Sequence, residues 1–277
     1  MEYLQFYDGS KVPVLGFGTY KIDPADTKEA VLNALSSGYR LVDTAQDYEN
    51  EAEVGQAVRE CGIPRDKVFV TTKQDAGGYE RAKKDIDGSL LKAGLDYFDL
   101  MIIHWPTGED VGTYQALEEA VKAGKLRYIG VSNFNIRQLE DLMKQTSIKP
   151  VVNQIETSVY NQQVKQHDWL TKQGIIHEAW SPLASGPKEM MSDQVLQEIG
   201  QKYGKTAVQI ALKVLVQEKV WTIPRSVNPE HIKDNIDLFD FELSDDEMAA
   251  LRKLDKKQWC GWPKEMSEDV NGNPLLK

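Results

Sequence analysis

The chain has 277 residues, of which 41% are hydrophobic and 27% are charged, and its formal net charge is −10 at pH 7. This length suits one large barrel domain, which we expect over residues 1–277 with a frayed tail at 264–277. The negative charge argues against nucleic acid and anionic membrane surfaces as partners, so an anionic ligand needs a local basic site.

The first residues show no cationic stretch followed by an apolar one, and no apolar run reaches the length of a membrane-spanning helix. The chain has only two cysteines, Cys61 and Cys260, too few for a disulfide framework. We therefore expect a cytoplasmic protein without a membrane partner.

Two alternating apolar runs around Asp8-Gly9 predict an opening hairpin over residues 3–16. Eight short apolar runs then predict strands at 16–22, 39–45, 68–73, 98–105, 127–133, 150–156, 175–181 and 220–226. Helical periodicity fills the intervals, for example at 26–38, 112–125, 136–146 and 206–219.

Two further helical segments depart from the simple alternation. Residues 188–204 predict one extra helix before the last helix–strand pair, and residues 244–253 predict a surface helix with a capping box formed by Ser244 and Glu247. The alternation favours parallel strands with right-handed crossovers. We predict an α/β fold, a (β/α)8 TIM barrel with an N-terminal β-hairpin and extra C-terminal helices; a doubly wound open sheet is the alternative.

Barrel enzymes carry their active sites at the carboxyl ends of the strands. A single polar residue at such an end is most simply a hydrogen-bonded structural group. Here seven consecutive strand ends carry polar or aromatic groups, which indicates a site: Asp43, Lys73, His104, Ser132–Asn133, Gln154, Trp180–Ser181 and Arg225–Ser226.

Asp43 and Lys73 end neighbouring strands, so they are expected to pair across the barrel mouth and to remain ionised. Tyr48 follows Asp43 on a loop, where Lys73 is expected to lower the pKa of the phenol. Such a phenol can protonate a carbonyl oxygen, and His104 can donate a hydrogen bond to the same oxygen. This set suits carbonyl reduction and does not suit hydrolysis, because it offers no activated Ser or Cys and no catalytic carboxylate pair.

Residues 4–256 resemble the aldo-keto reductase family, and the bacterial 2,5-diketo-D-gluconate reductase-like members in particular. Three long motifs carry the resemblance: "GYRLVDTAQDYENEAEVG", "GKLRYIGVSNF" and "IPRSVNPEHIKDN". Shorter matches occur in the expected order, namely "TTK", "LMIIHWP", "VVNQIE" and "EAWSPL". The resemblance implies a carbonyl reductase, and it also implies a monomer.

By this resemblance Tyr48 is the general acid, Asp43 and Lys73 tune it, and His104 positions the carbonyl. The resemblance also implies a nicotinamide cofactor held by Ser132, Asn133, Gln154, Trp180, Ser181, Leu183, Arg225, Ser226, Val227, His231 and Asn235. The stretch "LGFGTY" lacks the third glycine and the helix of a dinucleotide motif. We interpret it as a tight strand approach that places Gly18 and Thr19 beside the cofactor and Tyr20, with Trp105, in the substrate pocket.

His231 stands where the family usually has an arginine that contacts the 2′-phosphate of NADP. A neutral His binds phosphate less firmly than Arg, so NADP(H) is expected to be preferred while NAD(H) remains open. The loops after Lys73 and His104 are shorter than in many relatives, which predicts a more open mouth.

The sequence therefore predicts an NAD(P)H-dependent carbonyl reductase for keto-sugar acids, aldoses or small reactive aldehydes. The alternatives are a catalytically retired nicotinamide-nucleotide-binding regulatory protein and a barrel hydrolase or isomerase for phosphorylated sugars. No metal is expected, because no His/Cys/Asp cluster has ligand spacing. Whether the tail with Trp259 and Trp262 lines the pocket or packs outside is left open. His167 is expected to be exposed on a polar helix.

Overall fold

The computed structural model describes residues 1–75, 77–184, 186, 188–261 and 270, so the predicted frayed tail lies, apart from Val270, outside the described residues. Eight strands form one parallel sheet in chain order, and each strand lies within its predicted range or within one residue of it. They are β3 (Phe17–Gly18), β4 (Leu41–Asp43), β5 (Phe69–Gln74), β6 (Phe98–Ile103), β7 (Leu126–Ser132), β8 (Val152–Glu156), β9 (Ile176–Trp180) and β10 (Trp221–Thr222).

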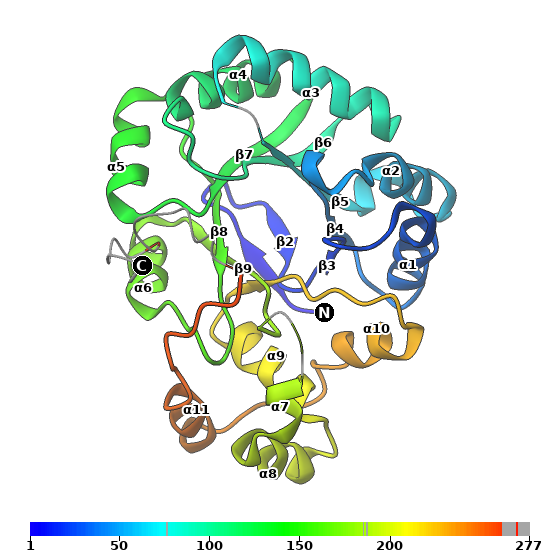
Figure 1. Cartoon of the computed structure of the whole chain (residues 1–277), viewed down its shortest axis with the longest axis vertical. Helices are drawn as coiled ribbons and strands as arrows, with labels where there is room; N and C mark the ends of the chain where they lie inside the picture. The colour runs from blue at the N-terminus through cyan, green and yellow to red at the C-terminus, as the bar shows by residue number, and fades with distance from the viewer. Residues whose placement is uncertain (76, 185, 187, 262–269, 271–277) are drawn as a thin grey trace.

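The sheet curls into a barrel, and backbone contacts between its two outer strands join the seam (Figure 1). Leu15 and Thr222 form a parallel bridge, and the Gly18 amide donates to the Pro224 carbonyl at 3.0 Å. A Cβ at Gly18 would lie 2.9 Å from the Ile223 carbonyl oxygen, so only glycine fits this approach. The predicted (β/α)8 barrel is confirmed, and the open sheet was the wrong alternative.

Helices surround the sheet, as the alternation predicted (Figure 1). They are α1 (Pro24–Ser36), α2 (Glu51–Glu60), α3 (Tyr79–Ala93), α4 (Asp110–Lys122), α5 (Ile136–Gln145), α6 (Val164–Gln173), α7 (Lys188–Ser192), α8 (Gln194–Tyr203), α9 (Ala207–Gln217), α10 (Pro229–Ile236) and α11 (Asp245–Arg252), with the short 3₁₀ helices η1 (Gln46–Tyr48) and η2 (Arg65–Lys67).

The prediction of one helix over 188–204 is wrong, because the chain forms α7 and α8 there. Asp193 lies between them, and its carboxylate accepts hydrogen bonds from the backbone amides of Val195 and Leu196. An acceptor in this position caps a new helix rather than continuing the old one. The capping box of Ser244 and Glu247 at α11 is confirmed. None of the helices in the described residues is long and apolar enough to cross a membrane.

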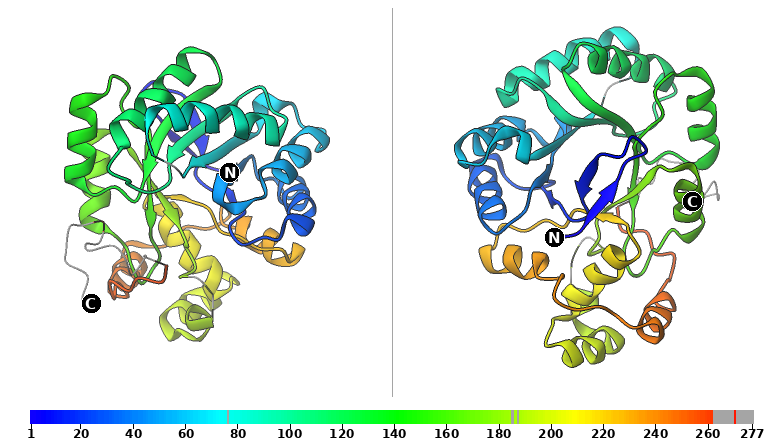
Figure 2. Two further views of the ribbon diagram at one scale, coloured as in Figure 1. Left: turned by 45° about the horizontal axis from the view of Figure 1, so that its top comes forward. Right: turned by 180° about the vertical axis from the view of Figure 1, so that it is seen from behind.

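An N-terminal hairpin, β1 (Tyr3–Gln5) and β2 (Lys11–Pro13), closes the end of the barrel at which the strands begin. Seen from behind, it lies across the centre of the ring (Figure 2). Its Phe6 is buried, with its ring 4.6 Å from that of Tyr128 and 6.2 Å from that of Trp221. The carboxyl ends of the strands, which carry the predicted site residues, therefore lie at the opposite end of the barrel.

Candidate active site

A buried ion pair lies where β4 and β5 end. Lys73 is fully buried and Asp43 is 2% exposed; the Lys73 ammonium contacts the Asp43 carboxylate and donates to the Thr44 carbonyl at 2.9 Å. Desolvation acts to lower the pKa of Lys73, but the charge of Asp43 and the Tyr48 phenol raise it above its ordinary value. Lys73 therefore remains a cation inside the barrel, as predicted.

The Tyr48 ring lies beside this pair, with the Lys73 ammonium 4.6 Å from its centroid. Burial raises the pKa of Tyr48 to about 12, the nearby Lys73 lowers it, and Asp43 raises it again. The expectation that the pKa falls is thus wrong, because desolvation and Asp43 outweigh the lysine. The phenol consequently keeps its proton at neutral pH.

Aromatic rings form a continuous row from Tyr48 across the strand ends. Ring centroids are 5.0 Å apart for Tyr20 and Tyr48, 5.7 Å for Tyr48 and His104, and 6.4 Å for His104 and Trp105. Trp105 and Trp180 are 6.3 Å apart. The predicted acid, the predicted carbonyl-orienting histidine and the predicted pocket residues are therefore neighbours.

Three buried polar side chains gather at the ends of β7 and β8. The Ser132 hydroxyl donates to the Gln154 carbonyl at 2.7 Å, and the Asn133 side-chain oxygen accepts from the indole nitrogen of Trp180 at 2.9 Å. The Gln154 amide nitrogen donates to Asp43 at 3.1 Å. This network links three of the predicted cofactor-binding residues to the ion pair beside Tyr48.

Five of the residues predicted to hold the cofactor lie after β10. Arg225 and His231 are exposed, and within the described part of the chain Arg225 has no carboxylate partner. Ser226 precedes α10, Val227 is half exposed, and Asn235 is buried on α10, one turn after His231. Arg225 is thus an exposed cation without a carboxylate partner among the described residues of an acidic protein.

Four remaining candidates have evident structural contacts. Thr19 is fully buried, and its hydroxyl donates to the Asp43 carbonyl at 2.9 Å, whereas Gly18 lies in the barrel seam. Leu183 is partly buried against the hydrophobic core, and Ser181 has a left-handed φ of 53° directly after β9.

Several residues at this end of the barrel were not singled out from the sequence. Asp75 follows β5 and contacts the His104 ring, Glu156 ends β8, and Glu178 lies within β9. The signal for Glu156 and Glu178 was their position in the short motifs of consecutive strands. Sequence gives no such signal for Asp75, whose contact depends on how the β5 loop turns. His167 is half-buried against His177, not exposed as expected, with their Nδ1 atoms 3.1 Å apart.

Glu156 holds the start of the C-terminal tail. Its carboxylate accepts hydrogen bonds from the backbone amides of Cys260 and Gly261, the latter at 2.9 Å. A side chain at Gly261 would lie 2.9 Å from the Trp180 ring. The described part of the tail thus reaches the strand ends, while Trp262 lies outside the described residues.

Glu178 is fully buried in the barrel. Neither carboxyl oxygen has a hydrogen-bond partner in the described structure; Gln154 is its register neighbour on β8 but lies outside hydrogen-bonding geometry. Burial, and next the charge of Asp43, raise the pKa of Glu178 well above its ordinary value. The interior of the barrel therefore favours the protonated form of the Glu178 carboxyl more than water does.

Glu178→Gln should change the pH dependence of stability. Because the folded-state pKa is raised, the folded protein keeps a proton that the unfolded chain releases, so this carboxyl costs stability as pH rises above its ordinary pKa. The loss of stability continues with rising pH until the folded-state pKa is reached. Urea denaturation from about pH 5 to about pH 8 should show that the free energy of unfolding of the variant rises relative to that of the native protein. Glu198→Gln, at an exposed position, is the control. If the stability of Glu178→Gln varies with pH in the same way as that of the native protein, the assignment is contradicted.

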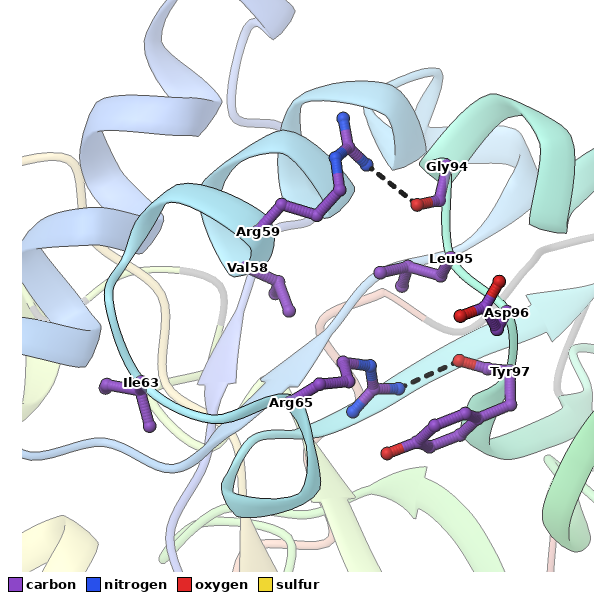
Figure 3. Close-up of a pocket in the computed structure, with 8 residues that line it drawn as sticks. All are labelled: Val58, Arg59, Ile63, Arg65, Gly94, Leu95, Asp96 and Tyr97. Atoms are coloured by element: carbon purple, nitrogen blue, oxygen red, sulfur yellow. Dashed lines mark hydrogen bonds between the residues drawn. The ribbon is translucent and has the colours of Figure 1, made fainter.

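A depression of about 220 Å³ lies at the other end of the barrel, beside the segments that precede β5 and β6 (Figure 3). Arg59 and Arg65 line it, but Arg59 donates to the Gly94 carbonyl at 3.1 Å and Arg65 to the Tyr97 carbonyl at 2.8 Å. Arg65 also pairs with Asp99 at 2.8 Å. Both guanidinium groups are thus bonded to other groups of the protein, and the depression lies away from the candidate site.

Comparison with known proteins agrees with this geometry. Residues 14–256 match the model of the Aldo/keto reductase family. Morphine 6-dehydrogenase of Pseudomonas putida is 42% identical, with 90% of this chain and 89% of that protein covered. Glyoxal reductase of Bacillus subtilis (strain 168) is 40% identical, with 93% and 94% covered.

A solved structure extends the likeness to three dimensions. The aldo-keto reductase of Bombyx mori in complex with NADP superposes with a TM-score of 0.87 and 33% identity, over 93% of this chain and 94% of that one. The fold, the order of the motifs and these relatives agree on an oxidoreductase that reduces carbonyls with a nicotinamide cofactor. The chain belongs to the aldo/keto reductase family.

Proposed function

We infer that Tyr48 is the general acid of this carbonyl reductase. The observation that carries the proposal is the buried Lys73–Asp43 pair directly beside the Tyr48 ring. A fixed cation at this position stabilises the phenolate that remains after proton donation. His104, whose ring meets that of Tyr48 edge-on, orients the carbonyl oxygen.

The polar groups near Trp180 fit a nicotinamide. Ser132, Asn133 and Gln154 offer hydroxyl and amide groups that complement a carboxamide, and the Trp180 ring is fixed by its bond to Asn133. A bound nicotinamide supplies the hydride. The residues of this chain hold the carbonyl beside it, and Tyr48 donates the proton as the oxygen gains negative charge.

Small polar carbonyl compounds are the substrates we propose, namely keto-sugar acids, aldoses and methylglyoxal-like aldehydes. Support comes from the relative named glyoxal reductase and from the mixed wall of aromatic and polar groups around Tyr48. The two cysteines are unpaired, in keeping with the reducing cytoplasm in which we propose that the protein acts as a monomer.

The first test is turnover, followed through the absorbance of NADPH and NADH in parallel. The substrates are 2,5-diketo-D-gluconate, xylose, methylglyoxal and glyceraldehyde. Oxidation of the cofactor that depends on the carbonyl supports the proposal. Tight cofactor binding without turnover would instead favour the retired nucleotide-binding protein.

NADP(H) is the cofactor that we propose is preferred, on the strength of the exposed Arg225 and the NADP-bound relative. His231→Arg should raise the preference for NADPH over NADH by about tenfold, because a guanidinium makes charge-assisted hydrogen bonds to a 2′-phosphate. The ratio of kcat/KM for the two cofactors measures this. Lys233→Arg, on the same exposed helix, is the matched control, and an unchanged ratio in His231→Arg would place the phosphate elsewhere.

A further inference from the structure

The Asp75 carboxylate contacts Nδ1 of the His104 ring. We propose that Asp75 is a positioning residue that fixes the hydrogen on Nδ1, so that His104 donates to the carbonyl oxygen from Nε2 only as a doubly protonated ring. This inference rests on the proposed reductase function, and it specifies the protonation state in which His104 takes part.

Hydrogen bonds from the surrounding chain hold both Asp75 and His104 in place. The Asp75 amide donates to the Gln46 side chain at 3.1 Å, and Gln46 belongs to η1, the turn that carries Tyr48. The His104 amide donates to the Gln74 carbonyl at 2.9 Å, and its carbonyl accepts from Asn133 at 3.0 Å. The carboxylate and the ring are thus held by the same elements that hold the acid.

The chemistry of the two groups then limits the state of the ring. An ionised carboxylate only accepts hydrogen bonds, so Nδ1 must carry the hydrogen. In a neutral ring of this tautomer Nε2 has a lone pair and cannot donate to a carbonyl oxygen. Only the doubly protonated ring offers a hydrogen from Nε2 while it stays bonded to Asp75.

The titratable groups in contact with the ring, among the described residues, are Asp75 and Tyr48. The Lys73 ammonium lies 4.6 Å from the centroid of the Tyr48 ring and is paired with Asp43. In the reduction step the hydride adds to the carbonyl carbon and the carbonyl π electrons move to oxygen, which takes the Tyr48 proton. His104 keeps both hydrogens, and its charge stabilises the oxygen as negative charge develops.

The first measurement is the nitrogen NMR spectrum of the histidine-labelled whole protein. The chain has four histidines, and His104→Gln identifies the signals of His104. We expect the signal of Nδ1 to be that of a protonated ring nitrogen, because Nδ1 faces the Asp75 carboxylate. A His104 ring with a bare Nδ1 would overturn the proposal.

Asp75→Asn provides the second measurement. The amide can donate to Nδ1, which allows a neutral ring that carries its hydrogen on Nε2. We expect the signal to move to that tautomer and kcat/KM to fall by about tenfold. Asp75→Glu should keep the hydrogen on Nδ1, and exposed Asp87→Asn should leave the spectrum and kcat/KM unchanged.

An unaltered tautomer in Asp75→Asn would also overturn the proposal. That failure is distinct from failure of the reductase assignment. The spectrum is recorded on the native protein without substrate, whereas the reductase assignment fails only if the native protein turns over no carbonyl.

Discussion

Tyr48→Phe should lower kcat by about 10²–10⁴-fold while leaving the affinity for the cofactor nearly unchanged. The variant loses only the hydroxyl that donates the proton, and the ring still fills the space between Tyr20 and His104. Steady-state kinetics with a reactive aldehyde give kcat, and quenching of tryptophan fluorescence gives the dissociation constant of NADPH.

The same residue predicts the alkaline behaviour of the native enzyme. Because burial raises the pKa of Tyr48 to about 12, the phenol remains a proton donor well above neutral pH. Any decline in the rate of reduction between neutral and mildly alkaline pH must therefore come from another group. Tyr79→Phe, which removes a hydroxyl bonded to the Glu119 carboxylate, is the control. Full activity in Tyr48→Phe would contradict the proposal that Tyr48 is the general acid.

Lys73→Met should destabilise the protein by about 3–5 kcal/mol, because it leaves the Asp43 carboxylate buried without its cation. Urea denaturation measures this as a lower midpoint at an unchanged slope. Activity should fall as well, since the phenolate of Tyr48 loses the charge that stabilises it.

A double variant separates the charge from the packing. Adding Asp43→Asn to Lys73→Met removes the unpaired carboxylate and should recover most of the lost stability, but not the activity. Lys83→Met, in an exposed pair with Glu119, should move the midpoint little. If the double variant is as unstable as Lys73→Met alone, the cost is one of packing and not of an isolated charge.

The barrel and the grouping of the candidate site residues could be predicted because both depend on a regular repeat. Each strand is a short apolar run, and parallel strands in a barrel must bring Asp43, Lys73 and His104 to the same end. The location of Tyr48 could be predicted because it is only five residues from Asp43 in the sequence. For such residues, chain order and strand direction together determine which side chains become neighbours.

Contacts that depend on loop paths could not be predicted in the same way. Asp75 meets His104 only because the loop after β5 turns towards β6, and Glu156 meets Gly261 across a long stretch of chain. The direction of the Tyr48 pKa shift was wrong for a related reason. The sequence shows which charges are near, but the extent of desolvation depends on the packed structure.

The seam between residues 15 and 222 has a consequence for how the protein is made. A chain emerging from the ribosome can complete β3 to β9 before Thr222 exists, and until then β3 presents an unpaired strand edge. Pairing between such distant segments is also slow, since the intervening chain must first be ordered. The growing protein thus passes through an open sheet that invites association with other chains, and the last strand ends this exposure.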